Sequence, residues 1–327
     1  MSAAGPPQGA NYAPSGGRGH SVAATAASVG VTTSTIAAAA AAPVPRSRSP
    51  SALLVRKLFR RKLVLAGAVI LVIVALLAIL APSITPYEPT ALKIMERMQS
   101  PRATHWFGTD ELGRDVFSRV IYGARYSLLI GAIVVAISVT AGVLLGLAAG
   151  FFRRLDGPIM RVVDAMMSFP DILLAIALVA VLGASIANVI LALAVVYTPR
   201  VARVVRASTL VVRELLFIEA ARALGVSTWR ILFIHILQNI ASPILVQATF
   251  IFAYAVLAEA GLSFLGVGVP PELPTWGTMI ASGQQFAHQA LWIVVFPGIA
   301  IILAALSLQM VGDGFRDLLD PRLRKAI

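Results

Sequence analysis

The chain has 327 residues, of which 58% are hydrophobic and only 13% are charged, and its mean hydropathy is +0.85. Soluble domains carry about 25% charged residues, so the composition excludes an ordinary soluble protein and predicts a membrane protein. The net charge of +12 would also suit a nucleic-acid-binding protein, and the chain has no cysteine. Disulfides, thiolate metal sites and cysteine nucleophiles are therefore excluded.

The first fifty residues form a segment of a different kind from the rest. Residues 1–50 are rich in Ala, Ser, Gly and Pro and contain no acidic residue. With few large apolar side chains to bury, they are predicted to be a disordered tail. A basic cluster then precedes an apolar run over 63–81, about the ~20 residues that a bilayer core requires. We expect residues 51–82 to hold this basic segment and the first membrane span, ended by Pro82.

A polar segment of mixed charge, residues 83–123, follows the first span and is the expected external loop. Its glycines permit turns, and either Thr109 or Asp110 is expected to cap a helix that runs toward Tyr122. The candidate functional residues of this segment can form turns, cap a helix or carry a charge. They are Gly108, Thr109, Asp110, Gly113, Arg114 and Asp115.

A core over residues 124–312 is expected to contain the other five spans. Their apolar runs lie at 126–152, 159–182, 185–205, 240–257 and 291–311. In the first of these runs, Gly142, Gly146 and Gly150 recur every four residues, which places them on one helix face. Small residues in this pattern allow membrane helices to pack closely. The sequence therefore predicts an all-α membrane protein with six transmembrane helices.

Two acidic residues lie inside the predicted third span. Asp164 and Asp171 are seven residues apart, so in one straight helix they would share a face. An acid within a membrane usually faces protein or water. The pair could touch a translocation pathway, or it could form ion pairs with Arg161 or a neighbouring helix. The ion-pair alternative is favoured because both acids lie near the predicted cytoplasmic end.

A third acidic candidate, Glu259, opens a run rich in glycine and proline, 259–277. Such a run is typical of a loop, so we expect an external loop here. Glu259 could be an acid of the substrate pathway or an interfacial group, and the interfacial role is favoured.

The charged stretch 213–239 is predicted to form a helix, a sharp turn and a second helix. Gly225 suits the left-handed residue that closes a helix, and Ser227 can cap the next one. Small Ala220 and Ala221 would let another surface approach, while Glu219 and Arg222 would supply polar contacts. The alternative is an ordinary surface hairpin.

The distribution of basic residues predicts the orientation. Eight Lys and Arg precede residue 63, three lie at 153–161, six at 200–230 and four after 312, against six at 93–125. By the positive-inside rule the side with both termini is cytoplasmic, and so are the 213–239 stretch and the tail 313–327. This placement also explains the positive charge without nucleic acid.

Several catalytic signatures are absent from the sequence. No phosphate-binding G-x-x-x-x-G-K-[ST], no H-E-x-x-H and no G-x-S-x-G occurs, and the four histidines are scattered. We therefore expect no catalytic residue, no metal site and no cofactor on this chain.

Three segments resemble one known family. Glu219, Ala220, Ala221, Gly225 and Leu237 resemble the EAA loop of ABC-importer permeases, although His235 and Gln238 replace the family's Ile and Pro. Segments 105–125 and 259–277 and the tail after residue 312 are similar to the C-type permeases of dipeptide, oligopeptide and nickel importers. The resemblance covers about residues 55–325.

The resemblance implies a type I ABC importer transmembrane domain in the plasma (inner) membrane, with a cytoplasmic coupling helix. It also implies four kinds of partner: a B-type permease, two ATPase subunits that bind ATP and Mg, an external substrate-binding protein and the lipid membrane. A peptide is the expected substrate. The alternatives are nickel or another small solute, a stand-alone secondary transporter or channel, and a membrane-embedded enzyme, which the missing signatures disfavour.

Overall fold

The computed structural model describes residues 62–319, and within them the chain is helical, with two isolated β-bridges and no strand. The predictions for residues 1–50, for most of the basic cluster and for the last eight residues lie outside this range. Five helices are long and apolar enough to cross a membrane: α3 (Lys62–Ile79), α5 (Val116–Phe151), α8 (Ile186–Val212), α12 (Ala241–Phe264) and α14 (Trp292–Leu319). The prediction of an all-α membrane protein is confirmed.

The sixth predicted span is a bent pair of helices. Helices α6 (Arg153–Met167) and α7 (Asp171–Leu182) together pass as one span but are bent by 93°. The prediction of one straight helix over 159–182 is wrong, and Asp164 and Asp171 therefore do not share a helix face. The break falls at Pro170, which has an extended backbone, because a proline disfavours helical geometry in the residue before it.

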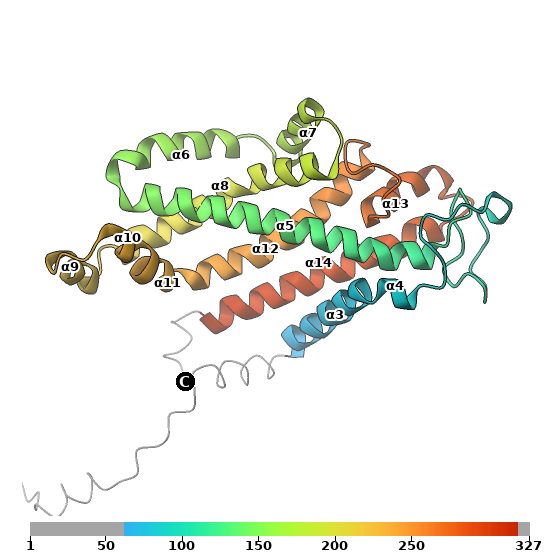
Figure 1. The fold of residues 1–327 in the computed structure, drawn as a ribbon, viewed down its shortest axis with the longest axis horizontal. Helices are drawn as coiled ribbons and strands as arrows, with labels where there is room; N and C mark the ends of the chain where they lie inside the picture. The colour runs from blue at the N-terminus through green and yellow to red at the C-terminus, as the bar shows by residue number, and fades with distance from the viewer. Residues whose placement is uncertain (1–61, 320–327) are drawn as a thin grey trace, which may run out of the picture. The chain divides into compact units, whose positions relative to one another are not determined.

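The short elements gather at the two ends of the long helices (Figure 1). One end carries α9 (Leu216–Ala223), α10 (Thr228–Arg230), the π-helix η3 (Ile231–Ile236) and α11 (Leu237–Asn239). The other end carries α4 (Ala81–Ile84), the 3₁₀ turn η2 (Ile94–Glu96), α13 (Trp276–Gly283) and the 3₁₀ turn η4 (Gln284–Phe286). The start of α3 and the end of α14 point toward the α9 end (Figure 1).

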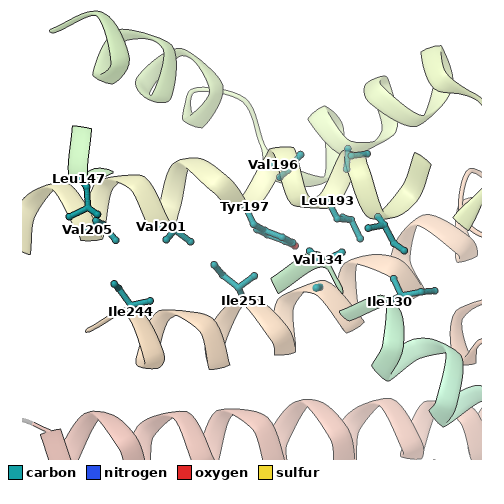
Figure 2. Close-up of a cluster of buried hydrophobic side chains, with 14 of the residues drawn as sticks. Ile130, Val134, Leu147, Leu193, Val196, Tyr197, Val201, Val205, Ile244 and Ile251 are labelled. Carbon is teal, nitrogen blue, oxygen red and sulfur yellow. The ribbon is translucent and has the colours of Figure 1, made fainter. Parts of the chain in front are cut away.

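Three helices supply most of the main hydrophobic core. Val134 of α5, Val201 of α8 and Ile251 of α12 are each completely buried where these helices meet (Figure 2). The same cluster continues into the short helices at one end through Ile218 and Ile236. One continuous core therefore links the long helices to the α9 end.

The predicted glycine face of α5 packs directly on α8. A Cβ atom added to Gly142, Gly146 or Gly150 would lie 2.4–2.6 Å from a Cβ of α8. The three neighbours are Val201, Val205 and Thr209. No real Cβ tolerates such distances, so the two backbones approach as closely as they do only because these residues are glycines.

Three predicted boundaries differ from the structure. Helix α5 begins at Val116 rather than near residue 126, so the last part of the expected loop 83–123 is helical. Helix α12 continues past residue 257 because the first left-handed residue is Gly266, with φ of 78°. Helix α14 runs past Val311 because Gly312 and Gly314 pack against Thr249 and Val64 instead of forming a turn.

We expect Gly146→Ala to destabilise the protein by about 1–3 kcal/mol, the usual cost of overpacking. The new methyl would meet Val205 Cβ at 2.6 Å and the Ala202 carbonyl oxygen at 2.7 Å, so α5 and α8 would have to separate. The measurement is thermal unfolding in lipid nanodiscs. Gly157→Ala is the matched control, because Gly157 lies in a helix with open space around it. Equal melting temperatures for both variants would contradict this packing.

Candidate functional site

The hairpin formed by α9 and the α10–η3–α11 helix is the first candidate site. Helix α9 ends as predicted at Gly225, which has φ of 75°. The N–H of Val226 donates to Ala221 O and the N–H of Gly225 to Arg222 O, both at 3.0 Å. This pair of bonds is a Schellman motif, which satisfies carbonyls at the helix end. The turn is therefore sharp and fixed by backbone geometry.

The second helix of the hairpin starts differently from the prediction. Ser227 occupies the cap position, but its side chain makes no capping hydrogen bond. Backbone bonding carries the chain from α10 directly into the π-helix η3, which includes His235. Ile231 and Ile236 of η3 are buried, so these two side chains face the core, whereas Phe233 and Ile234 are exposed.

The inner face of the hairpin is attached to the end of α5. Ile218 of α9 is completely buried in the main core. Arg213 donates from Nη1 to the Gly150 carbonyl oxygen at 2.7 Å. The guanidinium of Arg222 lies 4.9 Å from the centre of the Phe151 ring, a cation–π contact. Any displacement of α9 is thus transmitted to α5.

The outer face of α9 is apolar and open. Leu216 and Leu224 are 82% and 83% exposed, and the exposed Ala220 between them lies on the same helix face. Glu219 is also exposed, and Trp229, 71% exposed, stacks on the Phe233 ring with centroids 5.6 Å apart. Exposed apolar groups that gather like this mark an interaction surface.

The external-loop motif folds into a compact turn around Asp110. One oxygen of its carboxylate accepts hydrogen bonds at 2.9 Å from the N–H groups of Leu112 and Arg114, and the other lies 2.6 Å from Arg114 Nε. The same carboxylate lies 3.5 Å from Nε of buried Arg119. Asp110 therefore organises the loop and does not cap α5.

Two glycines of this motif are required by backbone geometry. Gly108 and Gly113 have φ of 74° and 75°. A Cβ at Gly113 would lie 1.8 Å from the Lys93 carbonyl oxygen. Beside Gly108, the Thr109 carbonyl oxygen accepts a 3.1 Å hydrogen bond from Trp292 Nε1, which ties the motif to the start of α14.

The cap of α5 is Asp115, not Thr109 or Asp110 as predicted. Its Oδ2 accepts from the N–H and the hydroxyl of Ser118, both at 2.8 Å, and its Oδ1 lies 2.8 Å from His105 Nδ1. The other ring nitrogen of His105 lies 3.2 Å from Glu96. Burial opposes the charge of Glu96, but the hydrogen bond with His105 and the charge of nearby Lys93 outweigh it and lower its pKa.

Glu259 lies in α12 and is completely buried, so its predicted place in an external loop is wrong. Three hydroxyl groups surround its carboxylate: Thr275 at 2.8 Å, Ser263 at 3.0 Å and Ser127 at 3.5 Å. Each hydroxyl oxygen also accepts a backbone N–H, from Thr278, Val269 and Trp276 respectively. Each hydroxyl thus accepts a backbone N–H and donates its own hydrogen to a carboxylate oxygen of Glu259. The carboxylate therefore joins α5, α12 and α13.

The two acids of the predicted third span form ion pairs with α8. Asp164 pairs with Arg203 at 2.5 Å and Asp171 pairs with Arg200. A third pair on the same helices joins Asp156 to Arg206, with one contact at 2.7 Å. The arginines recur every three residues on α8, so they lie along one side of the helix. This agrees with the ion-pair alternative, although the partner is not Arg161, and it removes the support that these acids gave to a secondary transporter.

Among residues 62–319, no group of three or more His, Asp or Glu side chains has the geometry to hold a metal ion. Up to six apolar spans instead define a multi-pass membrane protein, and its hairpin has an exposed apolar face.

Comparisons with known proteins identify the class. Residues 138–325 match the family described as binding-protein-dependent transport system inner membrane component, and residues 49–101 match the N-terminal transmembrane domain of oligopeptide transport permease C. A Brucella suis protein, named as a permease of a peptide transport system, is 51% identical over 84% of this chain and 93% of its own length. The dipeptide transport system permease protein of Alkalihalophilus pseudofirmus is 45% identical over 82% of this chain and 89% of its own length.

The chain therefore belongs to the family of binding-protein-dependent transport system inner membrane components, and it is a multi-pass permease subunit of an ABC transporter. The helical architecture is that of a type I ABC importer transmembrane domain.

Several residues of these sites were not predicted from the sequence. Ser127 and Thr275 are 148 positions apart and meet only at Glu259, so no local pattern could reveal them. The three arginines of α8 carry a detectable signal, because Arg200, Arg203 and Arg206 interrupt an apolar run at regular spacing. That spacing predicts a charged stripe on one side of a helix.

We expect Glu259→Gln to loosen the attachment of α13. An amide offers one acceptor oxygen in place of two, so at least one buried hydroxyl loses its acceptor. Each buried donor left without a partner reduces stability by about 1–3 kcal/mol. Hydrogen exchange of the backbone amides in 276–283 should become faster, and the melting temperature should fall. Glu272→Gln is the matched control, since Glu272 is exposed in the neighbouring loop. Unchanged exchange in 276–283 would show that Glu259 does not hold α13.

Proposed function

We propose that this chain forms half of the translocation pathway of an ATP-driven peptide importer. The relatives named above are permease proteins of peptide and dipeptide transport systems, and a permease from Pseudomonas aeruginosa named for di- and tripeptide transport is 42% identical over 80% of this chain. Agreement among several relatives in the class of solute supports peptides over nickel for this chain.

The hairpin over 213–239 is the proposed attachment point for a separate ATPase subunit. The observation that carries this assignment is the two-sided character of α9. Its inner side is fixed to the core by Ile218 and to α5 by Arg213 and Arg222, whereas Leu216, Ala220 and Leu224 are exposed within the described residues 62–319. A helix anchored on one side and apolar on the other suits a docking surface that must transmit movement.

In the proposed complex, a homologous B-type permease completes the pathway and two ATPase subunits bind ATP and Mg²⁺. A substrate-binding protein delivers the peptide from outside. The positive-inside distribution supports a cytoplasmic location for the hairpin and both termini. The segment 83–115 then lies outside, because Figure 1 places it at the opposite end of the long helices. This chain itself carries out no chemistry on the peptide.

Reconstitution tests the proposed function. Liposomes that contain this chain with its B-type permease, ATPases and binding protein should accumulate a labelled dipeptide when ATP is supplied, and should not accumulate nickel. Omission of the ATPases should reduce uptake to the background level. Uptake by this chain alone, without ATPases, would overturn the proposal, and ATP-driven uptake of nickel in place of the peptide would overturn the assignment of substrate.

Leu216→Glu should weaken attachment of the ATPase by about tenfold or more, equivalent to ~1.4 kcal/mol or more. The substitution places a charge in the apolar contact without disturbing the fold, since Leu216 is exposed. The measurement is co-purification of the ATPase with the permease. Met95→Glu is the control, because Met95 is also exposed but lies in η2 at the opposite end. Normal co-purification with Leu216→Glu would exclude the outer face of α9 as the contact.

A further inference from the structure

An apolar groove of about 600 Å³ lies between α3, α5 and α12. Leu71 and Ile79 line it from α3, Leu128 and Ala132 from α5, and Phe252 from α12. The volume is within the range of ~300–1,000 Å³ typical of ligand pockets. All three helices are candidate membrane spans, so the groove faces the region that lipid or another subunit occupies.

The groove contains one charged side chain, Arg125. This residue is exposed, and within residues 62–319 its side chain forms no ion pair or hydrogen bond. The arginines of α8 described above and Arg114 are each paired with aspartate. An uncompensated charge on a membrane helix is costly and usually marks a functional site.

The orientation of Arg125 is fixed by its neighbours in α5. Ala124 is buried in a hydrophobic cluster, and Gly123 packs so closely on Trp276 that a Cβ would lie 2.8 Å from its ring. Arg125 therefore points away from the core. Leu128, Leu129 and Ala132 follow at three, four and seven residues, so they extend from Arg125 along the same helix face.

The position of Arg125 along α5 also suits a residue at the interface between the membrane and water. It lies nine residues after Val116, the first residue of α5, or about 13 Å along the helix axis. Ile79, which lines the same groove, is the last residue of α3. The guanidinium is thus near the end of one span, while the apolar part of the groove extends toward the middle of the membrane.

We propose that this groove binds an anionic phospholipid, with the lipid phosphate on the guanidinium of Arg125 and an acyl chain along Leu71, Leu128 and Ala132. A planar guanidinium suits the phosphate oxygens, which it can bind through two parallel N–H groups. An anionic lipid matches both the charge of Arg125 and the apolar lining of the groove, which the two alternative occupants do not. A free phosphate would leave the groove empty, and an apolar helix of a partner subunit would leave the arginine without a counter-ion.

Native mass spectrometry of the assembled transporter tests the site. The complex is released from nanodiscs that contain equal amounts of phosphatidylglycerol and phosphatidylcholine. The wild-type complex should retain phosphatidylglycerol preferentially. Arg125→Gln should reduce that retention about tenfold, the effect expected when one charge-assisted interaction is lost. Ala132→Phe should also reduce it, because the ring would fill the groove while Arg125 stays in place.

Arg161→Gln is the matched control, because Arg161 is an exposed arginine of α6 that does not line the groove. It should retain phosphatidylglycerol like the wild type, and all three variants should keep the wild-type melting temperature. The proposal is overturned if Arg125→Gln retains the lipid normally, or if Arg161→Gln lowers retention equally. A cross-link from Ala132→Cys to a helix of the partner permease would also overturn it, since the groove would then be a subunit interface.

Discussion

The close approach of α5 and α8 is the constraint on which the other features depend. Three glycines of α5 allow it, and each would place a Cβ within 2.6 Å of a Cβ of α8. The last of them, Gly150, also presents its carbonyl oxygen to Arg213 at 2.7 Å. The packing of two spans and the attachment of the hairpin thus use the same residue. Because packed interiors are dense and transmit strain, a shift between α5 and α8 cannot leave the hairpin in place.

Charged groups serve different purposes at different depths. The three arginines of α8 hold α6 and α7 through partly exposed carboxylates, and exposed pairs of this kind contribute little to stability. Glu259 is the opposite case, because it is completely buried and is surrounded by three hydroxyl donors. The α8 pairs are therefore suited to rearrangement, whereas the Glu259 network is suited to holding α13 in one position.

The sequence predicts the helices of this fold better than their ends. Apolar runs and the glycine face of α5 identify the spans, and Gly225 predicts the turn of the hairpin, because each depends on local composition. Some errors are local, such as the break at Pro170 and the cap at Asp115, and others come from interactions between distant residues. Asp115 caps α5 where Thr109 or Asp110 was expected, Gly312 packs against Thr249 so that α14 continues into the expected tail, and Glu259 binds Ser127, which is 132 positions away. No local rule distinguishes a glycine that turns the chain from one that contacts a neighbouring helix.

The proposed coupling role follows from where the hairpin is joined to the long helices. Ile218 enters the main core, Arg213 and Arg222 contact the end of α5, and η3 leads through α11 into α12. A load on the outer face of α9 therefore divides between α5 and α12, which also form two walls of the Arg125 groove. The π-helix lies on the path to α12, and π-helical turns are frequent at functional positions. Because η3 is packed into the same core as α9, the proposed coupling would pass a load on the hairpin to both helices that wall the groove.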